Sequence, residues 1–197
     1  MCGRFILDDE TIREIIDLVD KIDQNITQNL EEKKFNRDFY PTSKAPVISY
    51  NDGRTLSEMI WGYPHFKGSG VIFNARSETV IEKRMFKNGI LENRAIIPVK
   101  SFYEWDRDKR KNIISRVDDE IMYLAGFYDK FEDEDRFVIL TTSSNKSMEK
   151  IHPRMPLILE KNEIWDYIKD PSLTREILKK TPKDIKYIDI EPQQTMF

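Results

Sequence analysis

The second residue of the chain carries the most distinctive chemistry. Cys2 is the only cysteine, and it becomes the first residue if the initiator Met1 is removed, as we expect when a small side chain follows. The α-amine of such a residue has a pKa of about 7.7–8.0 and its thiol one of about 8.5, so both nucleophiles are partly deprotonated at neutral pH. With an aldehyde, the nitrogen forms an imine and the sulfur then closes a thiazolidine ring. We predict that Cys2 is a nucleophile; the alternative is an incidental residue on a frayed end.

Two further residues have side chains suited to proton transfer. Glu104 lies among aromatic residues in the segment FYEW, 102–105. If it shares a buried face with Phe102 it is a candidate general acid and base, whereas strand alternation could instead turn it to solvent. His152 begins the segment HPRMP, whose two prolines stiffen the backbone, and it is a candidate proton carrier near neutral pH or else a structural histidine.

A polar segment, NARSE at 74–78, follows an apolar run and precedes an expected helix. Asn74 could orient an amine or a carbonyl through its amide, and Arg76 could complete an anion site at the start of the helix. Ser77 could cap that helix, and plain capping is the competing interpretation for the segment. No HExxH motif or carboxylate cluster is present, so the sequence predicts neither a metal site nor a cofactor.

Length and composition predict one domain spanning 1–197. Hydrophobic residues make up 39% of the 197 residues, enough to bury a core, and the 34% of charged residues nearly cancel to a net charge of −3. Residues 76–116 hold eleven Lys and Arg against six Asp and Glu, a net +5, so one face could attract an anion; part of this charge could instead belong to a solvated hairpin tip at 107–111. We expect a soluble, cytoplasmic monomer, because no signal peptide and no apolar run of about 18 residues is present.

The expected elements must hold these residues in place. The pattern predicts an amphipathic helix with an acidic first turn from Asp8 towards Ile22, a loop over 25–38, and a helix over 78–87 stopped by Gly89. A hairpin is predicted around Asn51-Asp52-Gly53. Further strands are expected at 71–74, 95–99, 102–105, 121–128, 137–142, 155–159 and 185–190, with helices at 164–168 and 173–179. This is an α+β domain with a mixed, mostly antiparallel β-sheet or open barrel and flanking short helices.

Several motifs in order resemble one family. They are CGRF at 2–5, PT at 41–42, WG at 61–62, NARSE at 74–78, FYEW at 102–105, AG at 125–126, ILTT at 139–142, and IH with RMP at 151–156. The chain thereby resembles the SOS-response-associated peptidase (SRAP) family, also called abasic-site processing proteins, over nearly its whole length.

The resemblance implies a sensor of abasic sites in single-stranded DNA that captures the opened sugar as a thiazolidine crosslink and is nucleoid-associated when crosslinked. By matching positions, Cys2 would supply both nucleophiles, Glu104 would be the acid that opens the sugar, His152 would assist proton transfer, and Asn74 would bind the attacking amine. The implied DNA-binding residues are Arg4, Phe66, Arg76 and Arg154, with Phe66 standing where the family commonly has a tryptophan that stacks on a base.

Two other functions stay open at this point. Cys2 with His152 and Glu104 could form an N-terminal-cysteine peptidase, as the family name implies. Alternatively, the protein could bind single-stranded DNA without a covalent bond, through Phe66 and the arginines. A lyase that stops at the imine and eliminates the 3′ phosphate is a variant of the covalent function.

Overall fold

Five strands close into a barrel in the computed structural model, which describes residues 2–32, 35, 37–65 and 68–190. The ring closes because β13 (Glu134–Ser143) pairs antiparallel with β12 (Met122–Phe131) and parallel with β5 (Arg54–Trp61). Between them run β9 (Arg94–Val99) and β4 (Lys44–Tyr50), in the order β12-β9-β4-β5. Short strands extend the ring: β2 (Lys21–Ile22) on β5, β8 (Asn74–Arg76) and β14 (Arg154–Pro156) on β13, and β15 (Ile158–Leu159) on β12.

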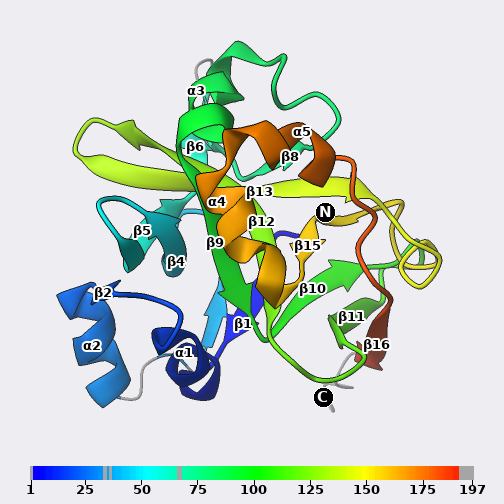
Figure 1. Ribbon diagram of the computed structural model, residues 1–197. Coiled ribbons are helices and arrows are strands. Elements are labelled where there is room, and N and C mark those ends of the chain that lie inside the picture. Colours follow the sequence, from blue (N-terminus) through cyan, green and yellow to red (C-terminus); the bar gives the residue numbers. More distant parts are fainter. Residues whose placement is uncertain (1, 33–34, 36, 66–67, 191–197) are drawn as a thin grey trace.

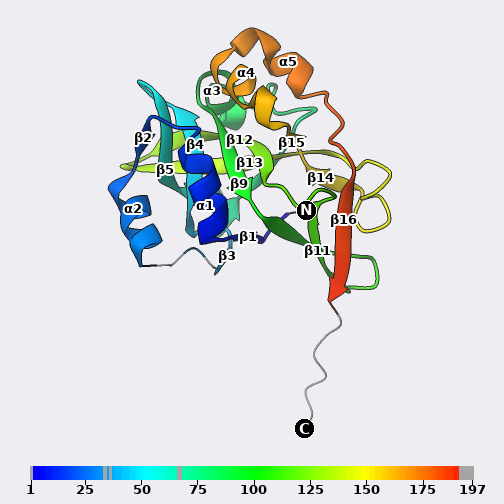
Figure 2. The same cartoon turned by 60° about the horizontal axis from the view of Figure 1, so that its bottom comes forward.

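A second, antiparallel sheet lies beside the barrel and carries the start of the chain (Figures 1 and 2). Its strand order is β16 (Ile185–Ile190), β11 (Lys111–Arg116), β10 (Ser101–Trp105), β1 (Phe5–Leu7) and β3 (Arg37–Phe39). A separate two-stranded pair joins β6 (Tyr63–Pro64) to β7 (Val71–Ile72). Because β1 pairs with β10 on one side and β3 on the other, the residues just before Phe5 are held at the junction with the barrel.

An aromatic cluster fixes β1 against the barrel. Phe5 stacks on Phe39 at 5.2 Å between ring centroids and meets Trp61 of β5 at 5.1 Å. Trp61 in turn stacks on Phe137 of β13, and its indole Nε1–H donates to the carbonyl of Phe73 at 3.0 Å. Phe5, Trp61 and Phe137 are fully buried, so the apolar area that they remove from water holds the chain start in a fixed position.

Short helices flank the strands (Figure 1). Helices α1 (Asp9–Ile16) and α2 (Gln24–Glu31) contact β9 and β5, while α3 (Arg84–Glu92) contacts β12 and α4 (Ile164–Lys169) contacts β9 and β4. The rest are α5 (Thr174–Ile177) and the 3₁₀ turns η1 (Lys161–Glu163) and η2 (Pro171–Leu173). The predicted α+β class with a mixed, mostly antiparallel sheet is confirmed. Among the described residues, none of the helices has the length and apolar character to cross a membrane.

Two element predictions in the first forty residues are wrong. The first helix ends at Ile16 rather than running to Ile22, because the amides of Asp20 and Asp23 bond instead to carbonyls of β5 at 2.8 and 2.9 Å. The predicted loop over 25–38 contains α2, which Asp23 caps and which buries Ile26 and Leu30 one helical turn apart. The acidic first turn, capped by Asp8, is confirmed.

The helix expected over 78–87 begins at Arg84 and passes through Gly89 instead of stopping there. A Cβ at Gly89 would lie 2.6 Å from the Phe127 ring and 2.9 Å from the Tyr128 carbonyl oxygen, so this glycine allows α3 to approach β12 closely. Ser77 therefore does not cap the helix; Lys83 occupies that position. The hairpin around Asn51-Asp52-Gly53 is confirmed, with positive φ angles of 52° and 128° at its last two residues.

Candidate functional site

Cys2 is completely buried at the junction of the two sheets. Two residues beyond it, the carbonyl of Arg4 accepts a hydrogen bond of 2.9 Å from the amide of Tyr103 on β10. The carbonyl of Cys2 itself accepts one of 2.8 Å from Asn74 Nδ2 on β8. Cys2 is therefore held from both sheets, and the interpretation of a frayed chain end is wrong.

Burial changes the chemistry of the Cys2 thiol. Loss of solvent, followed by the charge of Glu104, raises the pKa of Cys2 from its ordinary value of 9.0 to about 12. This pKa is that of the chain that still carries Met1, whereas the expected partly deprotonated thiol is that of the chain that begins with Cys2 and stays a prediction. The thiol needs a neighbouring base in order to act as a nucleophile.

Asn74 binds Cys2 through its amide nitrogen and leaves its amide oxygen available as an acceptor. Its Nδ2 donates to the Cys2 carbonyl, while its Oδ1 is buried and has no hydrogen-bond partner among the described residues. Asn74 and Arg76 point to the same side of β8, where they border a cavity of about 420 Å³ together with Lys83 and Phe86. An amide oxygen so placed can accept a hydrogen bond from an amine next to Cys2.

Glu104 faces inward. Its side chain is only 5% exposed, like the fully buried Phe102 and unlike Trp105, which is 43% exposed. The interpretation that Glu104 shares the buried face with Phe102 is therefore confirmed, and the solvent-facing alternative is wrong. Its charge contributes to the raised pKa of Cys2, so the carboxyl group lies within electrostatic range of the thiol.

His152 is oriented by the backbone of its own segment. Its ring Nδ1 lies 3.0 Å from both the amide nitrogen and the carbonyl oxygen of Arg154. Arg154 begins β14, which pairs with one edge of β13, while β8 with Asn74 pairs with the opposite edge. The sheet thus places the histidine and asparagine segments on the two sides of a single strand.

The predicted DNA-binding arginines differ in how free they are. Arg4 is paired with Asp38, and its guanidinium lies over the rings of Tyr40 and Tyr103 at 4.9 and 4.4 Å. Arg154 makes a two-point ion pair with Glu78, at 2.6 and 2.9 Å.

Arg76 is exposed and forms no ion pair with another described residue. Phe66 lies outside the residues that the structure describes. Of the predicted phosphate ligands, Arg76 therefore presents its charge most freely.

A family model described as SOS response associated peptidase (SRAP) matches residues 1–193. The chain belongs to this family. "Abasic site processing protein YoqW" of Bacillus subtilis (strain 168) is 32% identical over 200 residues, covering 91% of this chain and 87% of YoqW. "Abasic site processing protein YedK" of Escherichia coli (strain K12) is 28% identical over 169 residues, covering 81% of this chain and 75% of YedK.

A crystal structure of a Bacteroides thetaiotaomicron protein superposes with a TM-score of 0.81 at 23% identity, covering 96% of this chain and 92% of the other, which shows the same fold. The resemblance to the SRAP family drawn from the motifs is confirmed. In the part of the chain that the structure describes, no group of three or more His, Cys, Asp or Glu side chains could hold a metal ion.

Sequence reasoning missed the carboxylates that pair with this SRAP chain's arginines. Asp38 lies on β3 and Glu78 follows β8, and nothing in their spacing indicates a partner 34 or 76 residues away. Lys111 was also missed; its ammonium lies 3.9 Å from the centre of the Tyr103 ring. The sequence signal for it was the basic run at 107–111, which was interpreted as a possible solvated hairpin tip; in the structure Lys111 lies opposite Trp105 in the β10–β11 pair.

Proposed function

We propose that this SRAP protein captures abasic sites in single-stranded DNA covalently through Cys2, after removal of Met1. The observation that carries the proposal is the environment of Cys2. The residue is buried, its carbonyl accepts a hydrogen bond from Asn74, and its thiol feels the charge of Glu104. The names of the relatives, abasic site processing proteins, support the substrate. Abasic DNA presents an aldehyde when its sugar ring opens, which is the electrophile that an N-terminal cysteine traps.

The reaction begins at nitrogen. The α-amine of Cys2 adds to the C1′ aldehyde while Asn74 Oδ1 accepts one of its hydrogens. Glu104 as the carboxylic acid protonates the hydroxyl of the resulting carbinolamine, which leaves as water and gives the imine. His152 assists opening of the deoxyribose ring by proton transfer.

Ring closure then uses sulfur. The imine formed by loss of water is protonated. The thiol proton passes to Glu104, now a carboxylate, and the sulfur adds to the imine carbon while the C=N electron pair returns to the nitrogen, so that Glu104 ends as the carboxylic acid. The product is a thiazolidine, and one water is lost overall. The positive charge of the protonated imine, on the same residue as the thiol, lowers the thiol pKa and makes this proton transfer easier.

A peptidase function is less consistent with this environment. A cysteine nucleophile of a hydrolase is activated by a lowered pKa, usually next to a cationic histidine. In the chain that still carries Met1, burial and a neighbouring carboxylate raise the pKa of Cys2 to about 12. In the proposed reaction the thiol attacks only after the imine has formed on the same residue. It therefore does not need a lowered pKa before the substrate binds.

The test combines abasic single-stranded DNA with two variants. Wild type is expected to give an adduct that survives denaturation, and Cys2→Ala is expected to lose it. Because Cys2→Ala keeps an α-amine, borohydride should still trap its imine with the DNA. No stable wild-type adduct, or an equally stable one in Cys2→Ala, would refute the thiazolidine mechanism.

A further inference from the structure

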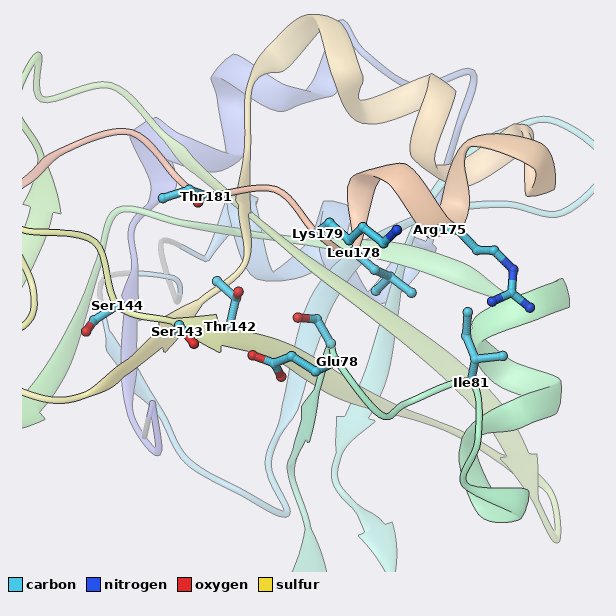
Figure 3. A pocket seen from close by; sticks show the side chains of 10 residues that line it. Glu78, Ile81, Thr142, Ser143, Ser144, Arg175, Leu178, Lys179 and Thr181 are labelled. Atoms are coloured by element: carbon cyan, nitrogen blue, oxygen red, sulfur yellow. The ribbon is translucent and has the colours of Figure 1, made fainter.

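A cleft of about 520 Å³ opens between α5 and the end of β13 (Figure 3). Arg175 on α5 and Lys179 just after it contribute two positive charges to one wall. Both side chains are exposed, and neither pairs with a carboxylate of another described residue. These two charges are therefore available to an anion.

The opposite wall is lined with hydroxyl groups. Thr142, Ser143 and Ser144 come from the end of β13 and the residue after it (Figure 3). Ser77 also lines the cleft; it is only 4% exposed, and its Oγ has no hydrogen-bond partner within the described residues. Hydroxyls and cations that line the same cleft are typical of contacts to phosphate and sugar oxygens.

The cleft also has an apolar part and a neutralised carboxylate. Ile81 and Leu178 provide apolar surface on which a sugar or a base can pack. Glu78 is the one acidic residue of the lining, and the two-point ion pair with Arg154 balances its charge. An anion entering the cleft therefore meets a net positive charge from Arg175 and Lys179.

The cleft adjoins the segments of the proposed site, because its lining residue Glu78 pairs with Arg154, whose segment holds His152. Ser77 follows Asn74 by three residues, about 10 Å at the rise of a strand, and its amide donates to the carbonyl of Thr141 at 2.8 Å. Arg154 also donates to that carbonyl, at 2.6 Å, and its backbone holds the His152 ring. A DNA strand bound at Cys2 therefore reaches this cleft within a few nucleotides.

We propose that this cleft binds a flanking nucleotide of the DNA strand that carries the lesion. Arg175 and Lys179 contact its phosphate, and the hydroxyl wall contacts the sugar and phosphate oxygens. This inference rests on the proposed function, because it assumes that the strand passes Cys2. It assigns to α5 and the residues after it a role in holding the substrate, separate from the chemistry.

Binding is measured with single-stranded oligonucleotides that carry a tetrahydrofuran abasic analogue, which has no aldehyde and cannot crosslink. The test protein is Arg175→Gln/Lys179→Gln. The matched control is Arg13→Gln/Lys130→Gln, which removes two exposed cations on α1 and β12. For the test protein, the slope of log K against log salt should fall in magnitude by about 0.7, the value for one phosphate of a single strand, because the two cations contact the same phosphate. The control should keep the wild-type slope.

Truncation of the oligonucleotide locates the contact. Removing the flank on one side of the lesion should make the test protein and wild type bind alike, whereas removing the other flank should preserve their difference. A test protein that behaves as the control with full-length DNA, or a difference that survives both truncations, overturns the proposal. If inorganic phosphate alone binds wild type and not the test protein while DNA affinity is equal, the cleft is a phosphate site and the DNA assignment is wrong.

The crosslinking assay with natural abasic DNA separates the two proposals. If wild type forms no stable adduct, the proposed function fails. If wild type forms the adduct, and the test protein and the control have equal salt slopes, only the assignment of the cleft fails.

Discussion

The buried thiol of Cys2 should react with iodoacetamide far more slowly in the folded protein than in the unfolded chain. Iodoacetamide reacts with the thiolate, and the thiolate fraction at neutral pH falls about tenfold for each unit by which the pKa rises. A rise from 9.0 to about 12 therefore predicts a rate roughly 1,000-fold lower for the folded chain that begins with Met1. The complete burial of Cys2 lowers the rate further by blocking access.

The assay is simple because Cys2 is the only cysteine. Alkylation is followed by intact mass with and without urea, and N-acetylcysteine in the same solutions corrects for the effect of urea on the reagent. Mass also separates chains with and without Met1; the chain that begins with Cys2 should react faster, since its α-ammonium lies beside the thiol. Glu104→Gln should speed alkylation of the folded protein, because it removes the charge that raises the pKa. Equal rates in folded and unfolded wild type would refute this reasoning.

Three further predictions concern stability. The buried Arg94 donates hydrogen bonds to four backbone carbonyls at the ends of α3 and α4. Arg94→Met should therefore lower the free energy of unfolding, measured by urea titration, by about 3 kcal/mol. A loss below about 1 kcal/mol would contradict this. Gly89→Ala should lower it by about 2 kcal/mol despite the better helix propensity of alanine, whereas Lys87→Ala on the exposed side of α3 should change little. The pKa of Glu78 lies below its ordinary value of 4.5 because Arg154 donates hydrogen bonds to its carboxylate. The stability that the ionised Glu78 adds to the folded state is therefore complete above pH 4.5 and is lost as the pH falls through the folded-state pKa. Wild type should therefore be more stable than Glu78→Gln at neutral pH, and the difference should shrink in acid; a constant difference would contradict the ion pair.

Local patterns predicted much of the fold because they act within a few residues. Asn51-Asp52-Gly53 supplies the positive φ angles that a tight hairpin needs, and the buried strand β9 reads as a continuous apolar run. The α2 helix was missed because its polar surface hides two buried positions, Ile26 and Leu30, in a segment that resembles a loop. Gly89 was misread because a helix stop and a close helix–strand approach use the same residue for different reasons.

Barrel closure and the ion pairs depend on contacts between distant segments. The parallel pairing of β5 with β13 joins residues about 75 positions apart, and no pattern in either strand indicates that register. At the site, the family resemblance implied Cys2, Asn74, Glu104 and His152 as a group. In the structure Asn74 hydrogen-bonds to Cys2, and the charge of Glu104 acts on the Cys2 thiol. The raised pKa of Cys2 could not be predicted, because it depends on how deeply the tertiary structure buries the thiol.

Tandem mass spectrometry of the N-terminal peptide after reaction with abasic single-stranded DNA tests the central claim most directly. The account predicts a peptide that begins at Cys2, carries the sugar remnant with the loss of one water, and resists iodoacetamide because nitrogen and sulfur are both bonded to the same carbon. A remnant on a lysine, a peptide that still begins with Met1, or a crosslinked Cys2 whose thiol can still be alkylated would contradict it.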